Sequence, residues 1–499
     1  MPNPYTKLLD RIKDIGRLQS VVGLLGWDQE TYMPKNGVTA RAEQFALLTG
    51  LAHQWLVADE TRKCLDEATA APDDFVAQTN IRETQRLFDR AVKVPTKLVK
   101  EIASSATVAK EVWTTARQNS DFAEFRPHLE KLVDLKKQEA ECVGYETEPY
   151  DALMDEFEPG LKAADVEQLF AELREQTVAL LDRIVRADHK PDPSILHRGF
   201  DVDEQARWSR RLAEALAFDF TAGRIDVSVH PFCTTIGGCG DVRITTRYQR
   251  DFLSSALFGT MHETGHALYE QGLLSQHRHT PMGHYVSLGL HESQSRLWEN
   301  LIGRSRPFWY YHFHDLKTTF PQALDRVSLD DFYGAINLVR PSPIRVEADE
   351  LTYNLHIILR FEIERALFDG SLEVHDVPAA WNEKFNASLG IEPPDDREGC
   401  LQDIHWAWAS FGYFHTYTLG NLYAAQLFAK ANKDIPELDD RIAANDHQPL
   451  LTWLRTHIHC HGQRYRAADL VKLVTGEPLT IRPFIDYATT KFSDIYKLT

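Results

Sequence analysis

The pattern that most constrains this chain is HETGH at residues 262–266, inside a largely apolar stretch that runs from residue 252 to residue 272. His262 and His266 are four residues apart, slightly more than one helical turn, so a helix places both imidazoles on one face. Glu263 lies beside them, where its carboxylate can reach a metal-bound water rather than the metal itself. The motif therefore predicts a metal-binding helix with Glu263 as a general base.

A catalytic zinc site of this type needs a third protein ligand, usually a carboxylate. Glu292 follows the first histidine by 292 − 262 = 30 residues and opens the next helix-period segment, so packing of the two helices would complete the site. Glu299 and Glu270 could also serve, although Glu270 shares the histidines' helix, and one straight helix cannot easily wrap three ligands around one ion. His291 suits an orienting role better than a ligand role.

Helix-period patterns dominate the rest of the chain. From residue 1 to about residue 192, apolar residues recur at i, i+3, i+4 and i+7, which predicts an N-terminal helical lobe. Residues from about 193 to 499 are expected to carry the metal and substrate sites. Because Gly and Pro are scattered and no repeat or long linker is visible, the whole chain, 1–499, is expected to form one catalytic unit. The sequence WDQETYMPKNG predicts a helix that ends near Tyr32 and a second that starts after Gly37.

A sheet signal precedes the metal motif. GRIDVSVHPF (223–232) and GDVRITTRY (240–248) are rich in β-branched residues that alternate with polar ones, and the Gly-rich CTTIGGCG lies between them. The pattern predicts two short antiparallel strands beside the metal-binding helix. An edge strand at this place can pair with the backbone of an extended peptide.

Composition narrows the class of protein. The net charge is 55 − 73 = −18, which argues against binding to nucleic acid or to an anionic membrane surface. The start of the chain lacks the basic-then-apolar order of a signal peptide, and the dense apolar run 21–27 is too short to span a bilayer. Six cysteines show no paired framework. We therefore expect a cytoplasmic protein with reduced thiols.

Six motifs together resemble one known family. In chain order they are HPF at 230–232, DVRIT at 241–245, HETGH at 262–266, HESQSR at 291–296, IRVEAD at 344–349 and GCLQDIHW at 399–406. Their identity and order are similar to those of the M32 metallocarboxypeptidases, the family typified by a thermostable Thermus carboxypeptidase. The stretches LLGWDQETYMP and HGQRY…VTGEP also resemble it, so the likeness covers nearly the whole chain.

The resemblance implies a mainly α fold of the gluzincin type, with a deep groove between helical walls and a relation to the neurolysin-type oligopeptidases. It also implies a homodimer that removes single residues from peptide C-termini with broad preference and uses zinc or, in some members, cobalt. By the family's pattern His262, His266 and Glu292 are the metal ligands, and Glu263 is the base.

The resemblance also assigns the substrate's terminal carboxylate to Arg345. A planar guanidinium binds a carboxylate through two parallel hydrogen bonds, so an acidic exopeptidase should keep an arginine near its metal. Arg345 heads a helix-period segment, whose first backbone NH groups would add to an anion site. Arg243 and Arg296 remain substitutes for this role.

The oxyanion formed during peptide hydrolysis needs a donor besides the metal, and Tyr417, Tyr413 or His230 can provide it. By the resemblance, the HPF and DVRIT motifs and the region 413–417 line the subsites. The candidate substrate-binding residues are accordingly Arg345, Arg243, Tyr413 and, from GCLQDIHW, His405.

Two other functions are compatible with the same motif. A zinc endo-oligopeptidase of the neurolysin type would use the same metal chemistry but cut internally, without an arginine at the end of its groove. A non-catalytic helical protein would hold a metal at HETGH for structural reasons only.

Overall fold

The computed structural model describes residues 3–71 and 73–498, and it divides into two compact units. Unit 1 draws on Met1–Val92, Asp192–Ile336 and Tyr423–Pro478, and unit 2 on Lys93–Pro191, Asn337–Leu422 and Leu479–Thr499. The lobe boundary expected near residue 192 coincides with a unit boundary, while the residues before it are divided between both units. A single catalytic unit over the whole chain stays a prediction.

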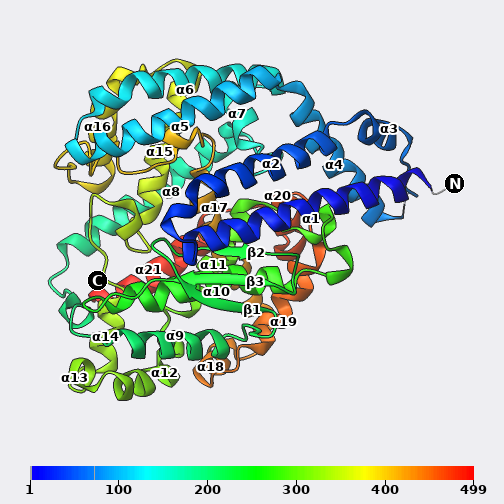
Figure 1. Cartoon of the computed structure of the whole chain (residues 1–499). Coiled ribbons are helices and arrows are strands. Elements are labelled where there is room, and N and C mark those ends of the chain that lie inside the picture. The colour runs from blue at the N-terminus through cyan, green and yellow to red at the C-terminus, as the bar shows by residue number, and fades with distance from the viewer. Residues whose placement is uncertain (1–2, 72, 499) are drawn as a thin grey trace. The chain divides into compact units, whose positions relative to one another are not determined.

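Unit 1 contains the sheet and most of the short helical turns (Figure 1). Its longer helices are α1 (Pro4–Thr31), α2 (Val38–Leu56), α3 (Asp59–Glu67), α4 (Phe75–Lys93, whose last residue belongs to unit 2), α9 (Val202–Ala215), α10 (Leu253–Gly272), α11 (Leu288–Arg296), α12 (Arg306–Thr319), α13 (Pro321–Leu324), α14 (Leu329–Ile336), α18 (Leu438–Ala443), α19 (Gln448–His457) and α20 (Ala467–Thr475). A π-helical turn, η5 (Leu297–Ile302), continues α11, and 3-10 turns lie at η1 (Lys35–Gly37), η2 (Pro193–Leu196), η3 (Ser275–His277), η4 (Pro281–Gly283) and η9 (His459–His461).

The described residues of unit 2 form helices and connecting loops and contain no strand. Its elements are α5 (Thr96–Asn119), α6 (Phe122–Val143), α7 (Pro149–Met154), α8 (Ala163–Arg186), η6 (Arg345–Glu347), α15 (Tyr353–Asp369), η7 (Val374–Asp376), α16 (Val377–Leu389), η8 (Trp406–Trp408) and α21 (Arg482–Tyr496). The long helix α17 (His415–Asp434) begins in unit 2 and ends in unit 1. The mainly α fold expected from the sequence is confirmed. Along the described chain, no helix is both long enough and apolar enough to cross a membrane.

The sheet has three strands in the order β1–β3–β2 and lies beside α10 (Figure 1). β3 (Val242–Thr246) pairs antiparallel with β2 (Cys233–Thr235) but parallel with β1 (Gly223–Val227). The small β element beside the metal-motif helix is thus confirmed, whereas the predicted antiparallel pairing of residues 223–232 with residues 240–248 is wrong.

The physical reason lies in the Gly-rich segment that was expected to connect the two strands. Its first residues form β2, and the turn is closed by a hydrogen bond from the Ile236 amide to the Asp241 carbonyl at 2.7 Å. Gly237 and Gly238 both adopt positive φ there, which costs glycine little. The hairpin therefore forms between β2 and β3, and β1 reaches the free edge of β3 in the parallel direction.

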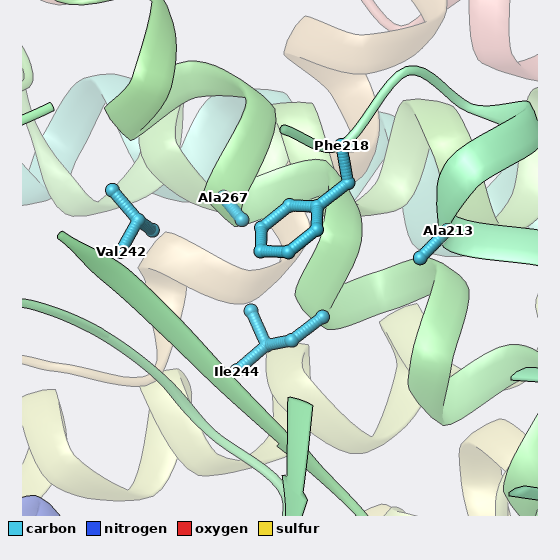
Figure 2. Close-up of a cluster of buried hydrophobic side chains, with 5 residues drawn as sticks. All are labelled: Ala213, Phe218, Val242, Ile244 and Ala267. Atoms are coloured by element: carbon cyan, nitrogen blue, oxygen red, sulfur yellow. The ribbon is translucent and has the colours of Figure 1, made fainter. Parts of the chain in front are cut away.

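Alternation along β3 joins the sheet to the metal-motif helix. Val242 and Ile244 point to one face and pack with Ala267 of α10 and with Ala213 and Phe218 (Figure 2). All five side chains are at most 4% exposed. Because side chains alternate across a strand, Arg243 lies on the opposite face. This small core fixes α10 against the sheet, and α10 carries both histidines of the motif.

The corner between α1 and α2 forms where the sequence predicted it. α1 ends at Thr31, and Pro34 disfavours a helical conformation at the residue before it. Asp28 accepts from Arg41 of α2 at 2.6 Å, and Tyr32 donates to Asp226 of β1 at 2.6 Å. The acidic and aromatic residues of this corner thus tie α1 to α2 and to the sheet.

Candidate active site

α10 and α11 bring the three predicted metal ligands together. Oε2 of Glu292 lies 3.6 Å from Nε2 of His262 and 3.4 Å from Nε2 of His266. One ligand atom from each of the three residues falls within 4.8 Å of the others. Two imidazole nitrogens and one carboxylate oxygen suit a divalent metal such as zinc. The donor set therefore fits a catalytic metal ion, because three protein ligands leave a fourth coordination position open.

Gly265 allows the two helices to approach this closely. A Cβ at this position would lie 2.6 Å from the Gln294 carbonyl oxygen and 2.7 Å from Cα of Ser295, both backbone atoms of α11. Such distances are shorter than van der Waals contact, so any side chain here would push α11 away. The glycine inside HETGH is thus what lets the Glu292 helix lie across the histidine helix.

The outer nitrogen of each imidazole is held by a different oxygen. Nδ1 of His262 lies 2.9 Å from Oε2 of Glu299, and Nδ1 of His266 lies 3.1 Å from the His291 carbonyl. A hydrogen bond at Nδ1 sets the tautomer and leaves the Nε2 lone pair for a metal. The position of Glu299 therefore suits an orienting partner of His262, while Glu292 is the carboxylate that converges with both histidines.

Glu270 and His291 also lie around the three ligands rather than among them. Nε2 of His291 lies 3.0 Å from Oε1 of Glu270, and the His291 ring stacks on that of His266 with centroids 4.3 Å apart and planes 14° from parallel. Burial would raise the pKa of Glu270, but His291 outweighs it and lowers that pKa. The pair positions both the ring and the carbonyl that contact His266.

Arg296 forms ion pairs with two glutamates, Glu292 of α11 and Glu299 of the π-helical turn η5 that continues it. Its Nε donates to Oε1 of Glu292 at 2.7 Å and its Nη1 to Oε2 of Glu299 at 3.2 Å. Residues 292, 296 and 299 share one face of a helix. Burial raises the pKa of a carboxyl, yet Arg296 and the neighbouring histidines bring the pKa of Glu299 to about 2 and that of Glu292 well below its usual range. Arg296 thus keeps these carboxylates ionised.

Glu263 is buried, with 6% of its surface exposed, and its carboxylate makes no hydrogen bond or ion pair with the described residues. Burial raises its pKa to about 7. In contrast to Glu292 and Glu299, it has no basic side chain bound to it. Its carboxylate is therefore available to a water molecule beside the three ligands.

The sheet region holds two further predicted residues of unit 1. Arg243 donates to both oxygens of Asp241, each at 2.9 Å, and its guanidinium lies 4.3 Å from the centre of the Trp27 ring. His230 is exposed in the connection between β1 and β2, and its ring makes no hydrogen bond within the described chain. Since neither side chain is bonded to any of the three ligands there, the roles of both stay predictions.

Unit 2 gathers the other predicted substrate residues. Arg345 lies 5.1 Å from the centre of the Tyr417 ring, and the hydroxyl of Tyr417 is 3.4 Å from Nε2 of His405. The ring of Tyr413 lies 5.3 Å from that of Tyr417 and 5.4 Å from that of His405. Four side chains from three stretches of the sequence thus form one cluster.

Two residues of this cluster were not foreseen as site residues. Arg345 donates from Nε and Nη2 to Asp403 and from Nη1 to the hydroxyl of Tyr353 at 2.9 Å. Asp403 lies inside the GCLQDIHW motif, but the sequence alone did not show that it is the partner of Arg345. Arg345 thus pairs with Asp403 and not with Glu347 or Asp349, the acidic residues nearest to it in the sequence.

A mainly helical protein with two histidines and one glutamate around a point, and an uncommitted glutamate beside them, has the architecture of a metallohydrolase. Comparison with known proteins makes the class specific. Residues 7–492 match the family described as carboxypeptidase Taq (M32) metallopeptidase.

Relatives of known sequence and structure agree over nearly the full length. The chain is 46% identical to thermostable carboxypeptidase 1 of Thermus thermophilus over 99% of both chains, and 40% identical to carboxypeptidase 1 of Bacillus subtilis over 99% of this chain and 98% of the other. The crystal structure of an M32 carboxypeptidase from Deinococcus radiodurans superimposes with a TM-score of 0.97 at 38% identity, covering 99% of this chain and all of that one. The chain belongs to the M32 family, and it is a metallocarboxypeptidase, as its motifs indicated.

Proposed function

We propose that this metallocarboxypeptidase removes single residues from the free C-termini of peptides, with broad preference, by attack of a metal-activated water. The observation that carries the proposal is the convergence of His262, His266 and Glu292 within 4.8 Å, beside an uncommitted Glu263. The breadth of preference is carried over from the family resemblance.

The three converging residues would hold zinc or, failing that, cobalt. When bound, such an ion supplies a Lewis acid that acidifies water and polarises the substrate carbonyl. The protein's share is to present Nε2 of both imidazoles and Oε2 of Glu292 toward one point. Glu299 and the His291 carbonyl hold the opposite nitrogens of the imidazoles.

Glu263 acts as the general base in this proposal. Its carboxylate takes a proton from the attacking water and returns it to the nitrogen of the leaving amine. The absence of a basic side chain bound to it, within the described chain, supports the assignment, because an ion-paired carboxylate is a weaker base. Tyr417 or His230 would donate a hydrogen bond to the oxyanion.

Recognition of the C-terminus is assigned to unit 2. Arg345 would bind the substrate's terminal carboxylate, and Tyr413 and His405 would line the same subsite, with Arg243 of unit 1 contacting the peptide elsewhere. The buried, hydrogen-bonded guanidinium of Arg345 supports this, because its orientation is set before substrate arrives.

A comparison of two peptides tests reaction and recognition together. The enzyme is incubated with a blocked peptide that has a free C-terminus and with the same peptide amidated at that end. We expect stepwise release of single residues from the free acid only. Equal cleavage of the amidated peptide, or cleavage at internal bonds, would contradict the proposal and favour a zinc endo-oligopeptidase. Removal of the metal with a chelator should abolish activity, and zinc or cobalt should restore it.

The proposal includes a cytoplasmic homodimer. All six cysteines are free thiols in the structure, which suits a reducing compartment. The dimer is carried over from the family resemblance, and analytical ultracentrifugation of the purified protein tests it. A monomer at micromolar concentration would contradict that part alone.

A further inference from the structure

Two buried arginines of unit 2 share one carboxylate. Arg345 donates from Nε at 3.0 Å and from Nη2 at 2.7 Å to Oδ1 of Asp403. Arg360 of α15 donates from Nε to the other oxygen, Oδ2, at 2.6 Å. Arg360 has no exposed surface, and Arg345 is 7% exposed. Each oxygen of Asp403 therefore serves one arginine, and Arg360 sets the rotation of the carboxylate that Arg345 contacts.

The shared carboxylate leaves the three residues with a net charge of 2 − 1 = +1. The other contacts to the two guanidinium groups come from neutral partners: the Tyr353 hydroxyl, the His356 carbonyl, and aromatic rings such as that of Trp381, 4.6 Å from Arg360. Cation–π contacts offset only part of the cost of a buried charge. The arrangement is therefore short of one negative charge.

The ionisable neighbours do not supply that charge. Burial lowers the pKa of His356 and of His405, the latter to about 4, so both rings are neutral at pH 7. Glu364, one turn after Arg360, accepts from the Tyr150 hydroxyl, the Trp406 indole and the Gly412 amide. Burial raises its pKa to about 7, which makes it a weak counter-ion.

We propose that Arg360 is a positioning residue for C-terminal recognition. It neutralises Asp403 by donating to Oδ2, the oxygen that Arg345 does not contact. Arg345 therefore keeps an uncompensated positive charge for the substrate's carboxylate. Without Arg360, Asp403 and Arg345 would form a balanced ion pair, and the substrate would have to compete with Asp403. The inference rests on the proposed role of Arg345 and deepens it.

The donors of Arg345 agree with this division of roles. A guanidinium has five N–H groups, and three are used on Asp403 and Tyr353, so 5 − 3 = 2 remain beyond the bonds found in the described chain. The two remaining N–H groups belong to the two terminal nitrogens. A carboxylate accepts such a pair side by side. Arg360 touches Asp403 and not this end of Arg345.

A charge-restoring mutant cycle tests the proposal. Arg360→Met leaves a net charge of zero, whereas Arg360→Met combined with Asp403→Asn returns it to +1 through Arg345 alone. We expect Arg360→Met to raise the KM for a blocked dipeptide about tenfold with a smaller change in kcat, and the double variant to recover part of that loss. Arg360→Lys, which keeps the charge, should lie closer to the wild type than Arg360→Met.

Binding of a product analogue provides a measurement that does not depend on turnover. The dissociation constant of N-acetyl-L-leucine should rise about tenfold in Arg360→Met and fall again in the double variant. The dissociation constant of the corresponding primary amide, which has no charge, should be the same in the wild type and in both variants. Circular dichroism and thermal melting check the fold. If Arg360→Met does not fold, Arg360→Gln takes its place, because it removes the charge but keeps an amide beside Asp403.

The outcomes separate this inference from the function on which it rests. If Arg345→Met abolishes discrimination between acid and amide, but Arg360→Met does not change KM, the role of Arg360 is refuted and that of Arg345 stands. A double variant that binds the acid more weakly than Arg360→Met would also refute the charge argument. If Arg345→Met keeps full discrimination, the carboxylate assignment itself fails.

Discussion

The metal-ligand cluster of unit 1 and the Arg345 cluster of unit 2 are built from buried charges in opposite proportion. Around the proposed metal ligands, the carboxylates whose pKa is lowered are Glu270, Glu292 and Glu299, and the basic side chains are Arg296 and Arg304, so the count is 2 − 3 = −1. Glu263 is not counted, as Glu364 is not in unit 2, because burial raises the pKa of each to about 7. Around Arg345, two arginines face one aspartate, and the count is +1.

The imbalance matches what each cluster is proposed to bind, a divalent cation in unit 1 and a carboxylate in unit 2. Burying a charge without a partner is costly, so a protein keeps such an imbalance where a ligand completes it. The sign of the missing charge, rather than any one residue, therefore distinguishes the two clusters. The following five substitutions probe this contrast, in order of decreasing expected effect.

Glu263→Gln should cause the largest loss. The amide keeps the size of the side chain but cannot accept the proton, so kcat should fall by roughly 10²–10⁴-fold or more. Metal content, measured by atomic absorption, should stay near that of the wild type because all three ligands remain. A variant with normal kcat would remove Glu263 from the chemistry, and loss of the metal would show that Glu263 supports the ligands instead.

Arg345→Ala tests the positive cluster directly. Removing a buried charge partner of the substrate carboxylate should cost about 2–5 kcal/mol in kcat/KM on free-acid peptides, since Asp403 is also left facing the subsite. Arg397→Ala, an exposed arginine of the same unit, is the matched control. An unchanged rate for Arg345→Ala would move carboxylate recognition to another arginine.

Glu299→Gln tests the orienting contact to His262. The amide can no longer hold the imidazole through a charged oxygen, so metal affinity should fall by about 10–100-fold. Competition with a fluorescent chelator measures the change. Glu204→Gln provides the control, because it removes an exposed carboxylate of α9 that pairs with its neighbour Arg207. Equal metal affinity in Glu299→Gln and wild type would show that this contact does not support the ligand.

Gly265→Ala tests the close approach of α10 and α11. Its Cβ would meet backbone atoms at 2.6 and 2.7 Å, so α11 must shift, at a cost of about 1–3 kcal/mol in the free energy of unfolding. Metal affinity should fall with it, because Glu292 moves with α11. Gly259→Ala on the same helix is the control, since its Cβ would meet nothing closer than 3.9 Å. If both variants melt alike, the crossing is not limited by Gly265.

Glu364→Gln tests the neutral acid next to the positive cluster. Burial raises its pKa to about 7 from an ordinary value of 4.5, so the folded state binds more protons than the unfolded state between these values. The contribution of Glu364 to the free energy of unfolding should therefore be largest below pH 4.5 and should decline as the pH rises toward 7. In thermal melts between pH 4.5 and pH 7, the melting temperature of the variant should not show this decline. An identical pH dependence in both proteins would show that Glu364 is ionised in the folded state.

The metal ligands were predictable because their spacing is local. Two histidines four residues apart share a helix face whatever surrounds them, and Glu292 lies in the middle of the next α-helix along the chain, α11. The corner between α1 and α2 followed from Pro34 for the same reason. The strand pairing was predicted wrongly, because alternation shows which segments form strands but not which of the three strands pair with one another.

The Arg345 cluster was predictable only in part. Its residues come from η6, α15, the segment before η8 and the start of α17, and no spacing rule connects them. Arg360 stands in the mostly apolar run NLHIILRF, where a single arginine signals a buried charge but not its partner. Asp403 belongs to the GCLQDIHW motif, but the sequence assigned it no role.

The helical class, the histidine pair with the glutamate beside it, and the family follow from the sequence alone, because these depend on periodicity and on motifs in chain order. Only the folded structure shows that Glu299 contacts His262 and Glu270 contacts His291, that β1 joins β3 in parallel, and that Arg360 shares Asp403 with Arg345. Each of these depends on which groups meet when distant segments pack. Burial then sets their charges, since a carboxylate or a guanidinium removed from water must find its partner in whatever lies beside it.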